Sequence, residues 1–564
     1  MNKIKTLALA VAALSAAGSQ AIEFNAGPVV GQINTSISYG VGFRTEDPDL
    51  KQVHPANANT ALGTNLPISS TQGGSTYNYD DGTLNYKKND MVTNVLKGNV
   101  DLELVWGDAG AFFRGSAFYD SVIMDEDPNF KPYNDQTKDA AGQGYDLLDA
   151  FVWYNAYLGD TPASLRLGRQ VVSWGESTFI LGGINSINPV NASAIRKPGV
   201  EVKEVLLPVN MAYGSFGLTD NVTLEAFYQL EWEKTRPDAC GTFFSTSDFI
   251  SDGCGPVFLG GTQDELVIAE NSLTSSQLIT TRITPDDEPS DDGQFGLALR
   301  WYSEALGDTE FGLYHMNIHS RLPLISGEAS GGANGATPKY QVVYPEDIKL
   351  TGLSFSRGTE SGWSIGGEVS LKQDVPFQWN SFELLQGGLR NPASLLTQQI
   401  IAPLVDSGMS EADAIASLSG QAFDGFDRFD VWQAQMTFIK FFDQVLGASR
   451  LSFVSEIGAT YIPDLPSLSE ARYGRSGAYG IGTIPDDTVS TGDLCTAPTL
   501  ADGTTTNTTK NLNTDYCTND GFVDELSYGI RARASLDYPN AFLGVNFKPQ
   551  LSIGLDEGTA PEPG

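Results

Sequence analysis

The most informative feature of the chain is a repeated alternation of apolar and polar side chains. Clear examples run over residues 33–43, 222–232, 363–371 and 526–538. Successive side chains of a β-strand point to opposite faces, so a period of two predicts strands with one apolar and one polar face. About 15 such strands can be recognised. They are expected to begin near residues 29, 95, 109, 146, 163, 204, 221, 293, 310, 346, 362, 429, 448, 526 and 541.

The connections between these strands alternate between short and long. The long ones are expected at residues 44–94, 121–145, 173–203, 233–292, 320–345, 374–428 and 463–525. Tight turns on one rim and elaborated loops on the other are typical of outer-membrane barrels, whereas a soluble β-sandwich or β-helix has no reason to sort its loops in this way. The pattern therefore predicts an all-β fold, an antiparallel transmembrane β-barrel. Because bacterial barrels usually have an even strand number, 16–18 strands are expected in the complete protein, with C-terminal hairpins missing from this sequence.

The N-terminus has the features of an export signal. Residues 2–5 supply positive charge, residues 6–17 form a short apolar run, and Ser19-Gln20-Ala21 offers small residues for cleavage after Ala21. The apolar run is shorter than the roughly 20 residues of a membrane-spanning helix. Residues 1–21 are therefore expected to be a signal peptide and residues 22–564 the barrel domain, exported to the bacterial outer membrane.

Composition narrows the classes of partner. The 564 residues contain 34 basic and 69 acidic side chains, for a net charge of −35. Nucleic-acid binding is not expected, because a protein that binds phosphates does so with Lys and Arg. Only 18% of residues are charged and 41% are hydrophobic, which leaves enough apolar surface to face lipid.

Several longer stretches resemble a known family. They include GRQVVSWGES at residues 168–177, INSINPVNASAIRKPG at 184–199 and FYQLEWEKTR at 227–236. With these motifs, residues 24–555 resemble the DUF1302 proteins of the Gram-negative outer membrane. The resemblance implies a β-barrel that acts in trans-envelope movement of hydrophobic or lipid-like molecules. It also implies two partners, a periplasmic DUF1329-type protein and an RND-type inner-membrane permease, and further C-terminal strands ending in an aromatic residue, which this sequence lacks.

Four cysteines fall in two of the long loops. In an exported protein, an even number of cysteines with two in each loop indicates disulfides. The expected pairs are Cys240 with Cys254 and Cys495 with Cys517. Free thiols or a metal site are the alternative, although no CxxC spacing supports a metal. Acidic clusters such as 125–127 and 286–288 could hold Ca²⁺ or simply be solvated, so no metal or other cofactor is predicted.

The polar faces of the strands should line the lumen. Charges are expected there because they meet water rather than lipid, and large aromatic side chains would make the lumen partly apolar. The expected lumen-facing residues are Arg114, Phe151, Trp153, Arg166, Glu225, Phe227, Glu231, Glu368, Lys372, Arg531, Arg533 and Lys548.

Two loops are candidates to fold inward. Residues 173–203 contain an apolar run at 179–181, and residues 374–428 contain a helical segment at 391–418 with a capping box that starts at Ser410. The helix is expected to plug the lumen, with the outer surface or a partner contact as alternatives. The aromatic residues Trp106, Tyr154, Trp232 and Trp301 lie near strand ends, where interfacial girdles occur.

Three functions remain open at the level of sequence. The first is a transport component for hydrophobic molecules, and the second is a porin for small polar solutes. The third is an outer-membrane hydrolase that uses His319 and Ser320. These residues are neighbours in the sequence, so in a strand their side chains would point to opposite faces, which argues against this function. No enzymatic activity is predicted, because no nucleophile, metal or phosphate motif stands in a supporting context.

Overall fold

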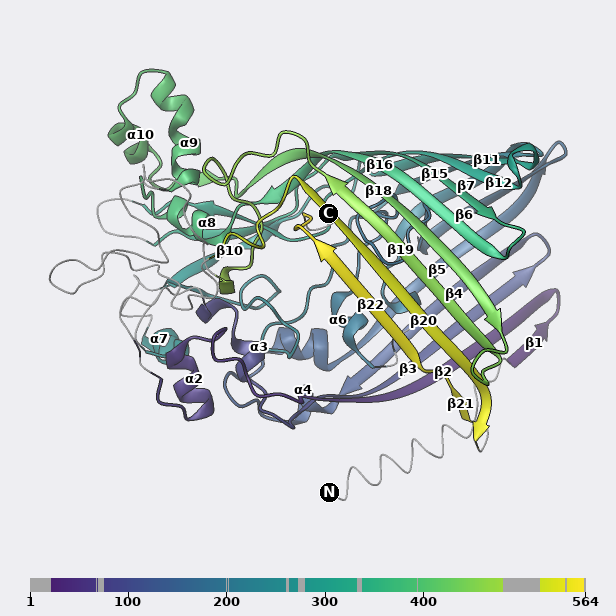
Figure 1. Ribbon diagram of the computed structural model, residues 1–564, viewed down its shortest axis with the longest axis horizontal. Coiled ribbons are helices and arrows are strands. Elements are labelled where there is room, and N and C mark those ends of the chain that lie inside the picture. The colour runs from purple at the N-terminus through teal and green to yellow at the C-terminus, as the bar shows by residue number, and fades with distance from the viewer. Residues whose placement is uncertain are drawn as a thin grey trace.

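In the computed structural model, one large antiparallel sheet curls into a barrel wall, and long loops form a cap at one end (Figure 1). The structure describes residues 22–561 except 67, 69–75, 199, 201, 260–262, 272–278, 332–336, 393, 480–517 and 543–544. The proposed signal cleavage at Ala21 and the pair Cys495 and Cys517 therefore lie outside the described residues.

The main sheet contains 17 strands in the described part of the chain. Each pairs antiparallel with the next strand of this sheet along the chain, except that β21 and β22 both pair with β20. Fifteen are 8 to 18 residues long, and β1 and β21 are short. The strands are β1 (Ile22–Ala26), β2 (Val29–Phe43), β3 (Met91–Trp106), β4 (Ala109–Asp120), β5 (Gln143–Leu158), β6 (Thr161–Gln170), β7 (Val209–Thr219), β8 (Val222–Gln229), β11 (Phe295–Ser303), β12 (Thr309–Ile318), β15 (Ile348–Gly358), β16 (Trp363–Gln378), β18 (Phe426–Asp443), β19 (Arg450–Tyr461), β20 (Leu526–Phe542), β21 (Val545–Phe547) and β22 (Gln550–Glu557).

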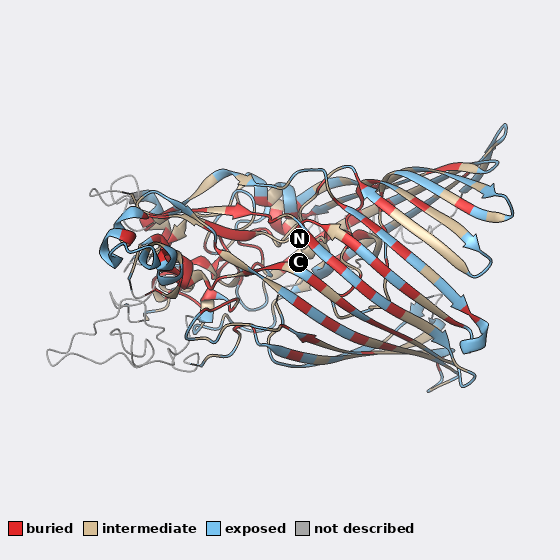
Figure 2. Cartoon of the chain, turned by 90° about the horizontal axis from the view of Figure 1, so that it is seen from above, coloured by how far each residue is buried: buried red, intermediate tan, exposed pale blue. Residues whose placement is uncertain are grey.

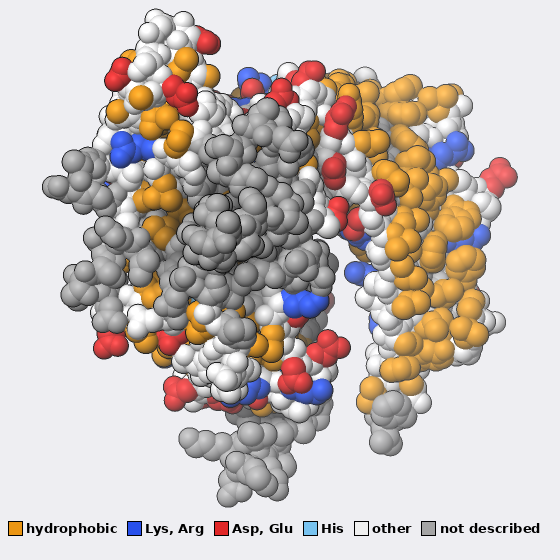
Figure 3. Space-filling view, turned by 60° about the vertical axis from the view of Figure 1, so that its left-hand side comes forward, with side chains coloured by type: hydrophobic (Ala, Val, Ile, Leu, Met, Phe, Trp, Pro, Cys, Tyr) orange, Lys and Arg blue, Asp and Glu red, His pale blue; other side chains and the backbone are white. Residues whose placement is uncertain are grey.

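Alternation along these strands puts apolar side chains on the outside of the wall. Large hydrophobic residues are exposed on strands throughout the sheet and form a continuous band in Figure 3. Exposed examples are Val100, Phe113, Val152, Tyr154, Leu165, Leu167, Tyr228, Leu297, Trp301, Leu313, Leu353, Val369, Trp432, Ile457, Tyr528, Ile530, Leu551 and Ile553. So much exposed apolar surface is unfavourable in water and suits contact with lipid.

The inward positions of the same strands are polar and often buried. Figure 2 shows that buried and exposed residues alternate along the wall strands. The strand register decides which inward side chains become neighbours. It pairs Glu368 of β16 with Gln435 of β18, and Thr437 of β18 with Glu456 of β19. All four are less than 7% exposed, although they face the lumen.

A second sheet lies in the cap and joins three loops. Its order is β17-β13-β14-β10-β9, with β10 parallel to β14 and the remaining pairs antiparallel. The bounds are β9 (Val257–Phe258), β10 (Ile279–Asp287), β13 (Leu324–Glu328), β14 (Lys339–Val343) and β17 (Ala422–Phe423). These strands were not predicted, because they pair segments that are remote in sequence.

Short helices complete the loops. They are α2 (Pro55–Leu62), α3 (Asp81–Leu84), α4 (Ser121–Asp125), α5 (Asp135–Thr137), α6 (Ala192–Arg196), α7 (Glu265–Asn271), α8 (Ser381–Gly388), α9 (Leu395–Asp406) and α10 (Glu411–Ser417). The α10 helix begins as the capping box predicts, since the Ser410 side chain accepts the N–H of Asp413. No helix in the described ranges is long and apolar enough to cross a membrane.

The predicted fold class, an antiparallel barrel of the transmembrane type with one rim of long loops, is confirmed. The strand starts agree within about five residues except for the last, because β22 begins at Gln550 after the short β21. The helical segment 391–418 lies at the outer end of the cap (Figure 1) rather than in the lumen. The reason is packing: Ile401, Ala414 and Leu418 bury their side chains against Ala329, next to the second sheet.

Candidate functional site

The lumen is crossed by the connection between β6 and β7, residues 171–208, which we call the inserted loop. Its first fixed point is Trp174, which is 1% exposed and packs against Phe227 and Tyr314 of the wall with ring centroids 5.0 and 5.8 Å away. The indole Nε1 donates to Glu225 Oε2 at 2.7 Å. Glu225 also pairs with Arg300 at 3.0 Å, so a charged network on β8 and β11 holds the start of the loop.

Glu456 of β19 holds the next part of the inserted loop. Its carboxylate accepts three consecutive backbone N–H groups of the inserted loop: Thr178 at 2.8 Å, and Phe179 and Ile180 at 2.6 Å each. Thr437 Oγ1 donates to the same carboxylate at 2.9 Å. Glu456 is fully buried, so these hydrogen bonds replace its lost hydration. Successive N–H groups that converge on one anion are a known anion-binding arrangement, here with the anion supplied by the wall.

Glu368 of β16 makes a second attachment of the same kind. Its carboxylate accepts the backbone N–H of Glu176 at 2.5 Å and of Ile184 at 2.9 Å, and Gln435 Nε2 donates to it at 2.7 Å. Two glycines allow the loop to approach this closely. A Cβ at Gly183 would overlap Glu368 Oε1, and Gly175 has φ +85° and would also meet the Glu368 carboxylate.

The far end of the inserted loop attaches to the opposite wall. Glu204 pairs with Lys97 of β3 and accepts Asn99 Nδ2 at 2.6 Å, and Lys203 lies 3.4 Å from Asp101. The loop therefore runs across the lumen, from Trp174 beside β8 through Glu456 on β19 to Lys97 on β3.

Several residues that the sequence assigned to the lumen contact one another or other residues of the wall. Arg114 pairs with Asp101 and Asp149 on the neighbouring strands at 2.9 and 2.8 Å. Arg166 is exposed, with its guanidinium over the rings of Phe151 and Tyr213. The Phe151 ring lies 6.1 Å from that of Trp153, so this wall of the lumen has aromatic side chains as well as charges.

The remaining predicted residues divide between wall, inserted loop and rim. Glu231 pairs with Arg169 at 2.8 Å, and Arg531 pairs with Asp556 at 2.6 Å. Arg533 lies over the Phe179 ring of the inserted loop, and Lys372 is 4% exposed on β16. Lys548 differs: it is exposed in the connection between β21 and β22, 3.8 Å from Asp537, because that hairpin turns at the rim.

Two cavities adjoin these elements. A lumen cavity of about 510 Å³ lies between the inserted loop and the wall, lined by Phe179, Ile180, Leu181, Lys372, Val375, Val431, Gln433 and Arg531 among others. A cap cavity of about 730 Å³ lies between the second sheet, α8 and the barrel mouth, where β16 ends at Gln378. Both have more apolar than polar lining.

The cap is held by the disulfide between Cys240 and Cys254, as predicted from the cysteine spacing. Asn134 Nδ2 donates to the Gly253 carbonyl at 2.7 Å, and Thr137 Oγ1 donates to the Cys240 carbonyl at 3.3 Å. The bridge therefore also fixes the loop between β4 and β5. The second predicted pair, Cys495 and Cys517, lies outside the described residues.

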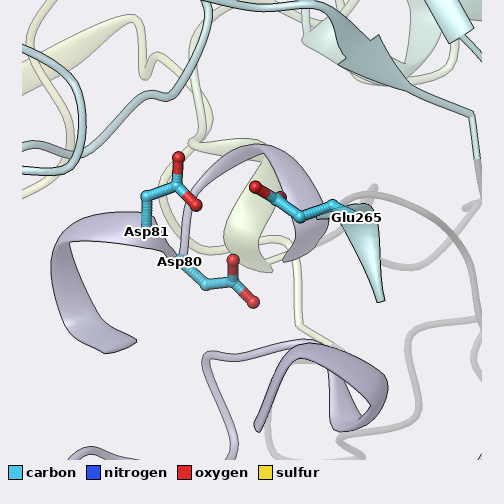
Figure 4. A group of neighbouring side chains, drawn as sticks. All are labelled: Asp80, Asp81 and Glu265. Atoms are coloured by element: carbon cyan, nitrogen blue, oxygen red, sulfur yellow. The ribbon is translucent and has the colours of Figure 1, made fainter. Parts of the chain in front are cut away.

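A group of buried carboxylates in the cap was not recognised in the sequence. Oxygen atoms of Asp80, Asp81 and Glu265 lie within 4.8 Å of one another (Figure 4), and Asp248 accepts the N–H of Asp81. Lys131 supplies a positive charge, 2.7 Å from Asp81 and 2.8 Å from Glu265. Burial and the neighbouring carboxylates raise the pKa of Asp80, Asp248 and Glu265, and the carboxylates raise the pKa of Lys131 despite its burial.

His54 lies beside this group and gives a pH prediction. It is fully buried and stacked on Tyr77, with centroids 3.5 Å apart, and its Nδ1 accepts the N–H of Ala56 at the start of α2. Burial lowers the pKa of His54 to about 3. The folded cap therefore holds neutral His54, whereas the unfolded cap binds a proton below about pH 6.5, so this contribution to stability is lost as the pH falls from 6.5 towards 3.

His54→Asn retains a helix-capping acceptor and removes this titration. The free energy needed to open α2 should fall between pH 7 and pH 5 in the wild type. We expect this fall to be about 2 kcal/mol larger in the wild type than in the variant. Hydrogen–deuterium exchange of the amides of α2, corrected for intrinsic rates, measures it. Parallel profiles for the two proteins would contradict the prediction.

The possible hydrolase pair has a structural role. His319 Nε2 lies 2.8 Å from the Asp292 carbonyl, and its Nδ1 accepts the Asp347 N–H at 3.1 Å. The Ser320 hydroxyl donates instead to the Leu322 carbonyl at 3.2 Å. Both residues are at most 2% exposed. The imidazole and the hydroxyl are thus engaged with backbone groups and are not directed at each other.

Sequence reasoning missed the groups on which the inserted loop depends. Glu456, Gln435 and Thr437 occupy inward positions of β18 and β19, and alternation alone could have placed them there. What alternation could not show is that Glu456 meets backbone N–H groups of residues 178–180, because that contact joins segments about 280 positions apart. Trp232 also differs from the expected girdle: it is 9% exposed and packs on Tyr344 in the cap.

Known proteins give two kinds of match. The family model described as "Protein of unknown function (DUF1302)" matches residues 3–564, and no curated protein matches the chain. Among solved structures, the outer membrane channel DcaP of Acinetobacter baumannii is 7% identical with a TM-score of 0.33, over 93% of this chain and 91% of that one. OmpT, an outer membrane protein of Vibrio cholerae, is 7% identical with a TM-score of 0.29, over 95% and 98%. OccAB1 of A. baumannii is 10% identical with a TM-score of 0.32, over 93% and 80%.

Proposed function

The chain belongs to the DUF1302 family, and from this premise we propose that it is an outer-membrane β-barrel that takes part in trans-envelope movement of hydrophobic or lipid-like molecules. The exposed apolar band over the strands supports the location. A cleaved signal peptide at residues 1–21 would direct export, as proposed from the sequence.

The observation that carries the proposed cargo is the course of the inserted loop. It crosses the lumen and brings Phe179, Ile180 and Leu181 to a cavity whose other walls include Val375 and Val431. Backbone attachments to Glu368 and Glu456 hold these apolar side chains at the middle of the wall strands. A wide water-filled pore has no need of such a lining, whereas a passage for hydrophobic molecules does.

Molecules of this kind need a route through the aqueous periplasm. We therefore include in the proposal a periplasmic DUF1329-type protein and an RND-type inner-membrane permease, which the family resemblance implies. Cross-linking in native membranes, followed by affinity purification of the full-length protein and mass spectrometry of bound proteins and lipids, tests this part. Recovery of neither partner above an untagged control would contradict it.

A porin for small polar solutes is the second candidate, and one observation favours it. Arg114, Asp101 and Asp149 form a mixed-charge row on β3–β5, and Arg166 is exposed on the next strand. Such a wall suits ions and hydrated solutes. The two functions differ in what the intact protein conducts.

Planar-bilayer recording of the full-length protein distinguishes them. We expect no large steady conductance from the wild type, and a large one when residues 176–184 are replaced by a Gly-Ser linker. Large, weakly selective conductance from the wild type would instead support the porin.

In cells, a deletion strain is expected to show an altered content of hydrophobic molecules in its outer membrane. Unchanged content would count against the transport proposal.

A further inference from the structure

The cap cavity differs from the rest of this acidic protein in the charge of its lining. The chain has 69 acidic residues, yet no Asp or Glu is among the described residues that line this cavity, and its charged lining residues are Lys339 and Arg475. Its walls are largely aromatic and aliphatic, and include Phe249, Phe258, Tyr340, Phe377, Trp379 and Phe382. A volume of about 730 Å³ lies in the range of small-molecule sites.

Two buried hydroxyl groups on this lining have no hydrogen-bond partner in the described part of the chain. They are Thr280 Oγ1, in a residue that is 5% exposed, and Ser247 Oγ. Both lie near β9. Thr280 is the strand partner of Val257 in β9. Ser247 precedes Asp248, and the backbone of Asp248 is hydrogen-bonded to Asn78, which in turn is hydrogen-bonded to Phe258 in β9. Buried hydroxyls are normally satisfied, so these two mark where a polar group of a ligand would lie.

We propose that the cap cavity is a binding site for an amphiphile with a long apolar body and a single carboxyl or hydroxyl end group. The body packs against the aromatic walls, and the end group hydrogen-bonds Thr280 and Ser247. A cationic amphiphile is disfavoured, because the described lining residues include no carboxylate to neutralise it. The role of the site in transport rests on the proposed function: the site would be the place at the barrel mouth where the transported molecule is first bound.

The architecture explains why such a site forms here. The second sheet contributes Thr280, Lys339 and Tyr340, α8 contributes Phe382 and Leu385, and the end of β16 contributes Phe377. Thr280, Lys339 and α8 come from three different connections, so the cavity exists only when the cap is assembled. It also opens near the lumen, since Pro561 lines both cavities.

The test is direct binding to the full-length protein in lipid nanodiscs, without detergent that could occupy the site. The probe is cis-parinaric acid, whose fluorescence rises in apolar surroundings, and empty nanodiscs supply the blank. We expect saturable binding with one site per chain. Dodecanoate and dodecanol should displace the probe, and dodecylammonium should do so at least about 10-fold less well. Equal displacement by all three, or no saturable binding above the blank, would overturn the proposal.

Paired variants tie the binding to this cavity. Leu385→Trp, which fills the cavity from α8, should weaken binding at least about 10-fold, while Leu404→Trp on α9, outside the lining, should not. Thr280→Val should weaken binding about 3- to 10-fold. Thr397→Val is its matched control, because Thr397 is also buried with an unpartnered hydroxyl but does not line the cavity. Equal effects of a variant and its control would refute the site.

The outcome is separable from that of the proposed function. Binding that depends on Leu385 and Thr280, in a protein whose deletion leaves outer-membrane lipids unchanged, would keep the site and remove the transport role. Loss of the probe signal with an intact transport phenotype would remove the site alone.

Discussion

Replacing Lys131 by Met is expected to destabilise the cap by about 3 kcal/mol at pH 7. The variant leaves Asp80, Asp81, Asp248 and Glu265 buried together without the ammonium group that lies 2.7 and 2.8 Å from two of them. An unpaired buried carboxylate costs several kcal/mol, and the expected loss is at the lower end because the Lys131 side chain keeps 28% exposure. Hydrogen–deuterium exchange of residues 77–85 and 265–271 measures it.

The pH dependence of this loss identifies its cause. Burial and mutual repulsion already raise the pKa of Asp80, Asp248 and Glu265, so the folded cap binds more protons than the unfolded cap. These carboxyl groups therefore destabilise the folded cap least below about pH 4, and the destabilisation increases as the pH rises through their pKa values in the folded protein. The Lys131→Met defect should shrink on acidification. Lys88→Met, in an exposed pair at 4.0 Å, is the control and should change stability by less than about 0.5 kcal/mol.

Replacing Glu456 by Gln is expected to release the inserted loop from the wall. The carboxylate accepts the N–H groups of Thr178, Phe179 and Ile180 together with the Thr437 hydroxyl. An amide has one acceptor oxygen and would direct its own N–H groups at one or two of these donors. Loss of two hydrogen bonds to a charged group, about 1.5–3 kcal/mol each, should raise the undocked fraction of residues 176–184 at least about 100-fold.

Two measurements check this release. Exchange protection of residues 176–184 should fall, and planar bilayers should show conductance bursts that the wild type lacks. Glu103→Gln on β3, an exposed residue of the lumen wall, alters lumen charge equally and is the control. If both variants conduct alike, lumen charge rather than loop attachment governs the pore.

The barrel could be predicted from the sequence because its determinants are local. Alternation within single strands defines which side chains face out, and the lengths of the connections define the two rims. On β18, for example, Trp432 is exposed, whereas Gln433 and Gln435 on the other face are buried, as the pattern requires. Pairing each strand with its chain neighbour then needs no long-range information.

The cap and the contents of the lumen could not be predicted in the same way. The parallel pair β10 and β14 joins residues about 60 positions apart, and the carboxylate group with Lys131 unites three loops. No periodic signal accompanies such contacts. The same holds for His54, whose fully buried position beside Tyr77 comes from the folding of the loop between β2 and β3 around α2.

By itself the sequence determined the antiparallel wall, its apolar outer face, the rim of long loops and the Cys240–Cys254 bridge, since each depends on residues close together in the chain. The tertiary structure decided that the inserted loop crosses the lumen on Glu368 and Glu456, that α9 and α10 stay outside it, and that the cap encloses a cavity whose described lining residues include no Asp or Glu. These features depend on which distant segments meet, and that choice is made by burial of side chains from several loops at once rather than by any one segment.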